Sequence, residues 1–171
     1  ACIISKTDAG GNLVYVNENF RNLSGYSNDE LIGSNHRLIS SGLHSRDFWI
    51  DMYRVTLQEK KIWKGLVTNK AKNGRLFYLE TYINANFDKV SGKHLGFTSV
   101  RSDITPVKTR EKAYLNRMNA INRSNLVVEF DVDGTIRGAN DMFLELMEYT
   151  FDEIKGKHHR ILVSPEKADS Y

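Results

Sequence analysis

Trp63, Gly65 and Asn69 have the residue types and the spacing to hold a flat ligand on one face of a strand. Side chains alternate between the two faces of a strand, so these three residues and Val67 share one face. An indole can stack on a ring, an amide can hydrogen-bond to its edge, and a glycine lets a ligand approach the backbone. The alternative is that Trp63 fills a hydrophobic core and Asn69 satisfies a strand end.

A short polar segment precedes this strand and could complete the pocket. It consists of Gly33-Ser34-Asn35-His36-Arg37, and Arg46 follows at the start of a predicted helix. Arg37 and Arg46 could neutralise a diphosphate at the pocket mouth, because guanidinium groups bind phosphates through paired hydrogen bonds. For either arginine taken alone, a surface ion pair is the alternative.

The composition of the 171 residues is typical of a soluble globular protein, with 40% hydrophobic and 26% charged residues. The net charge is only +3 and the basic residues are scattered, so we expect no nucleic-acid partner. No apolar run is long enough to predict a membrane span in this chain. The single cysteine, Cys2, excludes an internal disulfide and fits a cytoplasmic setting. We expect the chain to be a fragment, because it begins in mid-strand and stops soon after Ser164-Pro165, and the full-length protein could be membrane-anchored.

No residue pattern predicts catalysis. The sequence contains no nucleophile elbow, phosphate-binding loop, paired-carboxylate motif or metal-ligand spacing. We therefore expect a binding module with no catalytic residue and no metal site. Any catalysis would lie in an output domain further along the polypeptide.

The first hundred residues alternate between strand and helix patterns in a way that predicts an α+β domain. Two strands, several short helices and three further strands form a five-stranded antiparallel sheet with helices on one face. The predicted strands cover residues 2–7, 13–16, 62–70, 75–87 and 94–104. Asn17, Ser27 and Ser45 have side chains that cap helix N-termini, and the helix after Ser45 is predicted to extend to roughly Glu59.

A helix without Gly or Pro is predicted from Val107 to Arg123. Tyr114, Met118 and Ile121 share one of its faces, so the helix is either a solvated linker or a surface that pairs with its own copy in a homodimer. Asp103 and Thr105 lie at the joint between the last strand and this helix. Asp103 could accept hydrogen bonds from the first backbone N–H groups of the helix and so couple the two elements.

The sequence repeats itself with a constant shift of 123 positions, from Asp8 to Asp131. The identities include Asn17 with Asn140, Phe20 with Phe143, Gly33 with Gly156 and His36 with His159. An ungapped register over about thirty residues indicates tandem domains. We expect a first domain over 1–105, a linker helix over 106–124 and the N-terminal part of a second domain over 125–171.

The order of these elements, together with short motifs, resembles a PAS domain. The matching motifs are Asn17-Glu18-Asn19-Phe20, Gly25-Tyr26, Glu30-Leu31-Ile32-Gly33, the Asn73-Gly74 turn and Arg101-Ser102-Asp103-Ile104-Thr105. The resemblance covers about residues 2–105 and again about 126–171. It implies the PAS fold and a sensory role in bacterial signal transduction, with a histidine kinase or a chemoreceptor domain as output.

Within this family the first domain is similar to the flavin-binding group, which includes sensors of a nitrogen-fixation regulator, an aerotaxis receptor and a methane-oxidation kinase. Gly33-x-Asn35 and Trp63-x-Gly65-x-x-x-Asn69 are its marks. The resemblance implies FAD as the cofactor and redox state or oxygen as the signal. The implied cofactor-binding residues are Ser5, Asn35, His36, Arg37, Arg46, Tyr53, Trp63 and Asn69.

His36 and Tyr53 depart from the residues common in that group. His36 also stands where light-sensing flavin domains have a reactive cysteine, so we expect no cysteinyl photoadduct. Two other PAS classes stay open. One is a haem-binding oxygen or gas sensor, with candidate axial ligands at His36, His44, His94, His158 and His159. The other is a cofactor-free dimerisation module.

Overall fold

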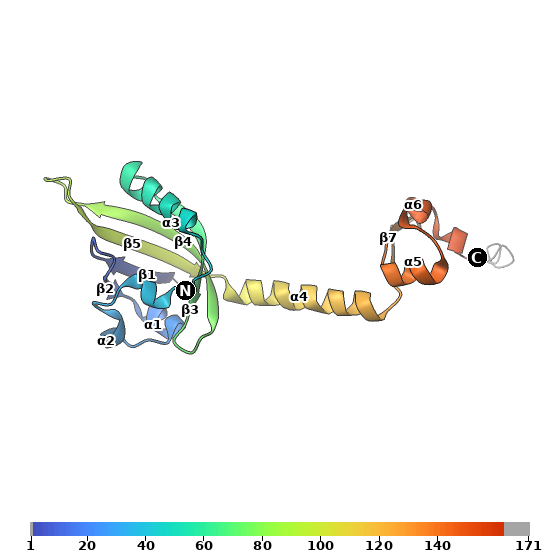
Figure 1. The fold of residues 1–171 in the computed structure, drawn as a ribbon, viewed down its shortest axis with the longest axis horizontal. Helices are drawn as coiled ribbons and strands as arrows, with labels where there is room; N and C mark the ends of the chain where they lie inside the picture. The colour runs from blue at the N-terminus through green and yellow to red at the C-terminus, as the bar shows by residue number, and fades with distance from the viewer. Residues whose placement is uncertain (1, 163–171) are drawn as a thin grey trace. The chain divides into compact units, whose positions relative to one another are not determined.

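The structure is a computed structural model that describes residues 2–162, and the chain divides into two compact units, 1–109 and 110–171. In the first unit the elements follow the predicted order (Figure 1). They are β1 (Cys2–Thr7), β2 (Leu13–Val16), α1 (Glu18–Ser24), α2 (Asn28–Leu31), η1 (His36–Ile39), α3 (Arg46–Tyr53), η2 (Arg54–Gln58), β3 (Trp63–Lys70), β4 (Leu76–Phe87) and β5 (His94–Asp103).

The five strands form one antiparallel sheet in the order β2-β1-β5-β4-β3, which confirms the α+β class and the predicted sheet. β2 and β3 are therefore its edges, and β5 lies at its centre between β1 and β4. Alternate residues of β4 are buried, and they are Phe77, Leu79, Thr81, Ile83 and Ala85. One face of the sheet is thus turned toward the core, as the period of two requires.

The short helices begin and end where their capping residues stand. Asn17 accepts a hydrogen bond from the backbone N–H of Phe20, and Gly25 ends α1 in a left-handed conformation at φ 74°. Ser27 and Glu30 form the reciprocal capping box of α2. These local bonds fix the path of the chain from β2 toward η1.

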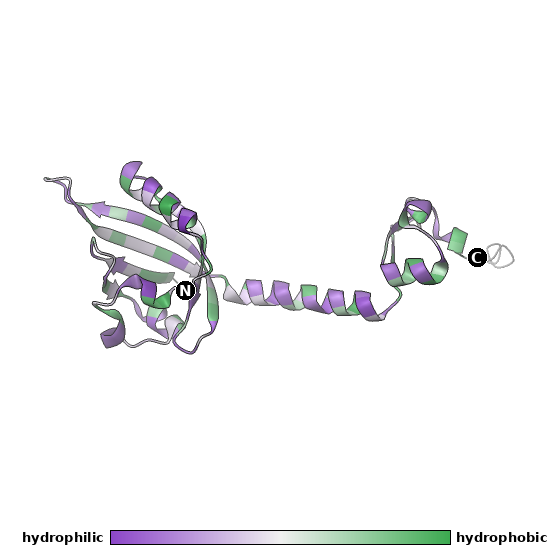
Figure 2. Cartoon of the chain, viewed as in Figure 1, coloured by the Kyte–Doolittle hydropathy of each residue, from purple (hydrophilic) through white to green (hydrophobic). Residues whose placement is uncertain are grey.

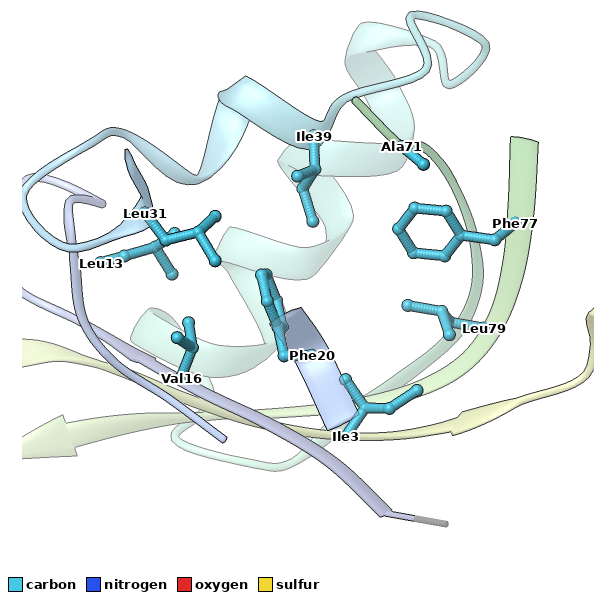
Figure 3. Packing of buried hydrophobic residues seen from close by; sticks show 9 residues of the cluster. All are labelled: Ile3, Leu13, Val16, Phe20, Leu31, Ile39, Ala71, Phe77 and Leu79. Carbon is cyan, nitrogen blue, oxygen red and sulfur yellow. The ribbon is translucent and has the colours of Figure 1, made fainter. Parts of the chain in front are cut away.

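A cluster of buried side chains from the helices and the sheet forms the main core. Figure 3 shows these side chains converging around Phe20. The cluster consists of Ile3, Leu13, Val16, Phe20, Leu31, Ile39, Ala71, Phe77 and Leu79. Because it draws on β1, β2, β4 and three helical segments, it holds η1 and its polar residues against the sheet.

The helix predicted to extend to Glu59 is regular only as far as Tyr53. It continues as the π-helical segment η2, in which the N–H of Glu59 bonds to the carbonyl of Arg54, five residues earlier. Thr56 becomes buried and donates its hydroxyl to the Met52 carbonyl at 2.7 Å, whereas Tyr53 is 45% exposed.

α4 (Thr105–Ser124) follows β5 and begins two residues before the predicted Val107. None of its residues is buried, and Figure 2 shows hydrophobic residues interspersed among hydrophilic ones along it. Tyr114 and Ile121 of the predicted stripe are exposed. Among residues 2–162, no helix combines the length and the apolar character that crossing a membrane requires.

The elements of the second unit reproduce the spacing of the first. They are β6 (Val128–Phe130), β7 (Ile136–Ala139), α5 (Asp141–Met147), α6 (Phe151–Ile154) and η3 (His159–Leu162). From β7 to η3 each pair of bounds equals that of its counterpart from β2 to η1, displaced by the 123 positions of the sequence repeat. Ile136, Phe143 and Ile154 are buried, as are Leu13, Phe20 and Leu31 at the equivalent positions. Residues 163–171, including Ser164-Pro165, lie outside the described part.

Two leucines on neighbouring strands provide a matched test of this packing. Leu79 on β4 is 1% exposed, whereas Leu66 on β3 is 56% exposed. Leu79→Ala should lower the free energy of unfolding by about 2–5 kcal/mol, because it leaves a cavity in the core. Leu66→Ala should cost less than about 1 kcal/mol. Urea denaturation measures both, and equal losses would contradict this assignment of the inner face.

Candidate ligand-binding site

The inward face of β3 carries Trp63, Gly65, Val67 and Asn69, as the alternation predicts. The indole of Trp63 lies over Gly65, since a Cβ added to that glycine would be 2.2 Å from the Cη2 atom of Trp63. The indole Nε1 donates to Asp51 Oδ2 at 3.0 Å, and its ring meets Phe48 edge-on with centroids 5.2 Å apart. Gly65 therefore makes room for the tryptophan. This geometry fits the alternative in which Trp63 packs the core.

Asn69 differs from Trp63 because its amide has unused hydrogen-bonding capacity. The residue is 4% exposed, and among the described residues nothing accepts a hydrogen bond from its Nδ2. A buried donor without an acceptor costs about 1–3 kcal/mol. An acceptor supplied by a ligand would remove that cost, so Asn69 is a strong candidate for a ligand contact.

The loop before α3 holds the end of β3 where Asn69 lies. The backbone N–H of Thr68 donates to Nε2 of His44 at 2.8 Å, and the Ser41 hydroxyl donates to the Thr68 carbonyl at 2.6 Å. Burial lowers the pKa of His44, which favours the neutral imidazole that can accept this bond. These two bonds hold the edge strand β3 at Thr68, next to Asn69.

A second buried polar group comes from β5, where Arg101 is 3% exposed. Its Nη1 donates to the Ser5 hydroxyl at 2.9 Å and its Nη2 lies 2.8 Å from Nε2 of His36. The guanidinium carbon lies 5.7 Å from the centre of the Phe20 ring. Of the ion pairs formed between residues 2 and 162, none includes Arg101. A buried cation thus has only neutral partners here.

The contact with Arg101 fixes the state of His36. Arg101 can only donate, so Nε2 of His36 must accept and the imidazole is neutral. Burial, reinforced by the charge of Arg101, lowers the pKa of His36 to about 3. Burial also lowers the pKa of Arg101 to about 10, which leaves it charged at neutral pH. The pair therefore consists of one cation and one neutral acceptor.

The register of the sheet brings these groups onto one face. Ser5 pairs with Ser99 across β1 and β5, and Arg101 pairs with Thr81 across β5 and β4. All four side chains are buried. Arg101 is not among the predicted site residues, although the sequence contains a signal for it. Its position in the alternation after Phe97 and Ser99 places a charge on the buried face.

Four other predicted site residues lie at the surface of the first unit. Asn35 caps η1 by accepting from the Arg37 N–H at 3.1 Å, and its Nδ2 donates to the Gly10 carbonyl at 3.2 Å. Arg37 and Arg46 are exposed, and Tyr53 is partly exposed with its edge against Phe97. The structure therefore buries Ser5 and Asn69, places the half-buried His36 against Arg101, and leaves these four outside this group.

The histidines other than His36 also have ring nitrogens engaged within the chain. His94 contacts the Gly96 carbonyl at 3.0 Å, and His159 contacts the Gly134 carbonyl at 3.1 Å. His158 accepts from the Arg160 N–H at 3.3 Å. Within residues 2–162 no cluster of three or more His, Cys, Asp or Glu side chains could hold a metal ion.

A separate surface hollow of about 310 Å³ lies between α1 and the β3–β4 turn. Its polar walls are already used by the fold. Arg75 donates to the Leu23 carbonyl at 3.3 Å, and Lys72 pairs with Glu30 at 2.5 Å. The buried face instead offers the amide N–H of Asn69, which has no acceptor among the described residues, and the guanidinium of Arg101, whose hydrogen bonds go to neutral groups. These donors fit a ligand whose edge carries carbonyl oxygens or negative charge.

Comparison with known proteins identifies the family. The model of the PAS domain matches residues 1–106 and 124–171. The chain belongs to the PAS domain family. The five-stranded antiparallel sheet with its short helices is the PAS fold.

Relatives of this PAS protein are signalling proteins. It is 31% identical over 162 residues to the biofilm dispersion protein BdlA of Pseudomonas aeruginosa, covering 95% of this chain and 39% of that protein. It is 30% identical over 103 residues to the aerotaxis receptor of Escherichia coli, covering 60% of this chain and 20% of the receptor. The chain thus spans well under half of either relative. It contains a PAS sensory module of the kind found in bacterial signal transduction.

Among solved structures, the fold resembles a light-oxygen-voltage domain whose mechanism was probed with a flavin analogue. The TM-score is 0.50 at 23% sequence identity, and the match covers 70% of this chain and 86% of that domain. At this identity the likeness concerns the fold.

The state of His36 predicts a specific pH dependence of stability. Below its ordinary pKa of 6.5 the unfolded chain binds a proton at His36 that the folded PAS domain excludes until about pH 3. The free energy of unfolding should therefore fall as the pH falls through this window, by up to about 1.4 kcal/mol per pH unit. His36→Asn should remove this contribution. Urea denaturation at a series of pH values measures it, and a difference between wild type and variant that stays constant with pH would contradict the buried neutral imidazole.

Proposed function

We propose that the first unit is an FAD-binding sensory PAS domain that responds to redox state or oxygen and signals through α4 to an output domain. The observation that carries the proposal is a buried donor that lacks an acceptor together with a buried cation that has only neutral partners. Asn69 has an amide without an acceptor, and Arg101 has a guanidinium without a carboxylate. Burying both would be costly unless a ligand accepts from them.

An isoalloxazine ring suits this donor set because its pyrimidine edge carries two carbonyl oxygens and ring nitrogens. Two of the similar proteins support the same choice. The light-oxygen-voltage domain was studied with a flavin analogue, and the aerotaxis receptor is named for a response to oxygen. Bound flavin would supply reversible uptake of electrons and protons. The protein supplies orientation, since Asn69 and Arg101 are fixed on strands two places apart in the sheet.

The proposed contacts fall into two groups. Ser5, His36 and Asn69 would surround the ring, and Trp63 would pack the core. The remaining residues lie at the surface and would bind the polar tail of FAD. They are Asn35, Arg37, Arg46 and Tyr53. In this arrangement the exposed arginines neutralise the diphosphate.

Two alternatives receive less support from these contacts. A haem would need an axial imidazole, and the half-buried candidate beside Arg101, His36, uses Nε2 for that arginine. A cofactor-free dimerisation module agrees with the packing of Trp63. It leaves the buried amide of Asn69 unexplained, however, and flavin explains it directly.

The output route that we propose starts at the joint after β5. Asp103 Oδ1 accepts from the Thr105 N–H at 2.9 Å, and the Thr105 hydroxyl accepts from the Tyr78 N–H at 2.9 Å. The first turn of α4 is therefore tied to both β5 and β4. A change in either strand would alter the start of the helix, which is the basis for two arrangements of α4.

We further propose that α4 pairs with its own copy in a homodimer, together with the faces of the PAS domain. Tyr114, Met118 and Ile121 form an apolar stripe with coiled-coil spacing on a helix without buried residues. The second unit would be the N-terminal part of a second PAS domain, following the linker helix over 106–124. A histidine kinase or chemoreceptor domain would receive the signal in a cytoplasmic protein.

Substitution of Asn69 tests the cofactor. Purified protein should show flavin bands roughly at 370 and 450 nm and release FAD on denaturation. Asn69→Ala should weaken FAD binding about 5- to 100-fold, because one buried hydrogen bond is lost. Asn84→Ala serves as a control, since Asn84 points to the exposed face of β4. A colourless protein that takes up no added FAD, or equal losses in the two variants, would contradict the proposal.

Substitution of Asp103 tests the coupling. Asp103→Ala removes the acceptor for the Thr105 N–H, so FAD should stay bound and reducible while α4 no longer responds to reduction. Spin labels on α4, measured in oxidised and reduced protein, report the response as a change in distance between copies. Asp88→Ala is a matched control, because Asp88 makes similar bonds in the β4–β5 turn. Identical distances in oxidised and reduced wild type would overturn the mechanism.

A further inference from the structure

Arg101 presents a buried positive charge to the face on which the ligand is proposed to lie. We infer that Arg101 sets the charge of the bound cofactor, so that the reduced flavin is held as an anion. The inference rests on the proposed flavin binding and extends it to a residue outside the predicted contact set. Arg101 is thereby assigned a role in determining how many protons accompany reduction.

The charge of Arg101 is uncompensated by the elements packed around it. Ser5 of β1 offers a hydroxyl, His36 of η1 offers a neutral ring nitrogen, and Phe20 of α1 offers a ring face. Thr81 of β4 stands opposite Arg101 in the sheet. None of these groups is ionised near neutral pH, so the cation has dipoles for partners but no counter-charge.

A group in this position interacts more strongly with a negatively charged ligand than with a neutral one. Low exposure strengthens the effect, because water screens buried charges weakly. His36 cannot remove the preference by taking up a proton, since its pKa of about 3 keeps it neutral over the working range. The buried face therefore favours the anionic form of whichever ring it holds.

This preference determines how many protons the flavin would take up when it is reduced. An external reductant such as dithionite supplies two electrons to the oxidised ring, and the reductant is itself oxidised. One proton from solvent binds at N5 and leaves a single negative charge delocalised over the pyrimidine half of the ring. A second proton at N1 would neutralise that charge. Arg101 opposes this second protonation because the neutral product loses the charge–charge attraction.

The test is the pH dependence of the flavin midpoint potential, measured between about pH 5 and pH 8 with dithionite as titrant. Wild type should show the slope of one proton per two electrons throughout. Arg101→Gln should change to two protons per two electrons at the acidic end, and its midpoint potential should lie below that of wild type at the alkaline end. Arg101→Lys should keep the one-proton slope because it keeps the charge.

Several outcomes separate this inference from the proposed function. Protein that never binds FAD contradicts the flavin proposal itself. Protein that binds FAD but shows a two-proton slope at pH 5 in the wild type overturns the role of Arg101, even if Arg101→Gln fails to fold. Equal slopes in wild type and a folded, flavin-loaded Arg101→Gln overturn it as well. Arg75→Gln, which removes an exposed cation, should leave the slope unchanged and controls for net charge.

Discussion

The hydrogen bonds of Arg101 join three parts of the first unit that are distant in sequence. The guanidinium on β5 reaches Ser5 on β1 and His36 on η1, so a central strand, its neighbour and the helical layer meet at one buried cation. A buried charge is costly unless it is hydrogen-bonded, and here the Ser5 hydroxyl and the neutral ring of His36 accept from the guanidinium. Burial and the charge of Arg101 together lower the pKa of His36. The preference for a negatively charged ligand that we propose would follow from the same buried cation.

β5 carries both Arg101, which we propose to face the ligand, and Asp103, which accepts a hydrogen bond from the first turn of α4. Arg101 lies two residues before Asp103, so both residues lie at the C-terminal end of β5. The central place of β5 in the sheet matters here, because β1 and β4 brace it on both sides. In the proposed mechanism, a displacement at Arg101 would reach the joint with α4 through β5, and Thr105 at this joint is also tied to Tyr78.

Most of the fold was predictable because it depends on local rules. Alternation marked the strands, and Asn17, Ser27 and Ser45 marked the helix starts through bonds that involve only neighbouring residues. The π-helical end of α3 was missed, since it depends on packing rather than on propensity. Spacing along the strand predicted Asn69 as a ligand contact, and this stays a prediction. The pairing of Arg101 with His36 was not predicted, because it spans 65 positions and needs the three-dimensional register.

The second unit reproduces core and cap residues of the first unit, but not every polar residue. Leu13 and Phe20 have buried counterparts in Ile136 and Phe143, and the N-cap Asn17 has its counterpart in Asn140. Ser5, however, is matched by Val128, which has no hydroxyl to accept from a guanidinium. The shared frame of caps and core therefore specifies the arrangement of strands and helices. The hydrogen bond between Ser5 and Arg101 is not part of that shared frame.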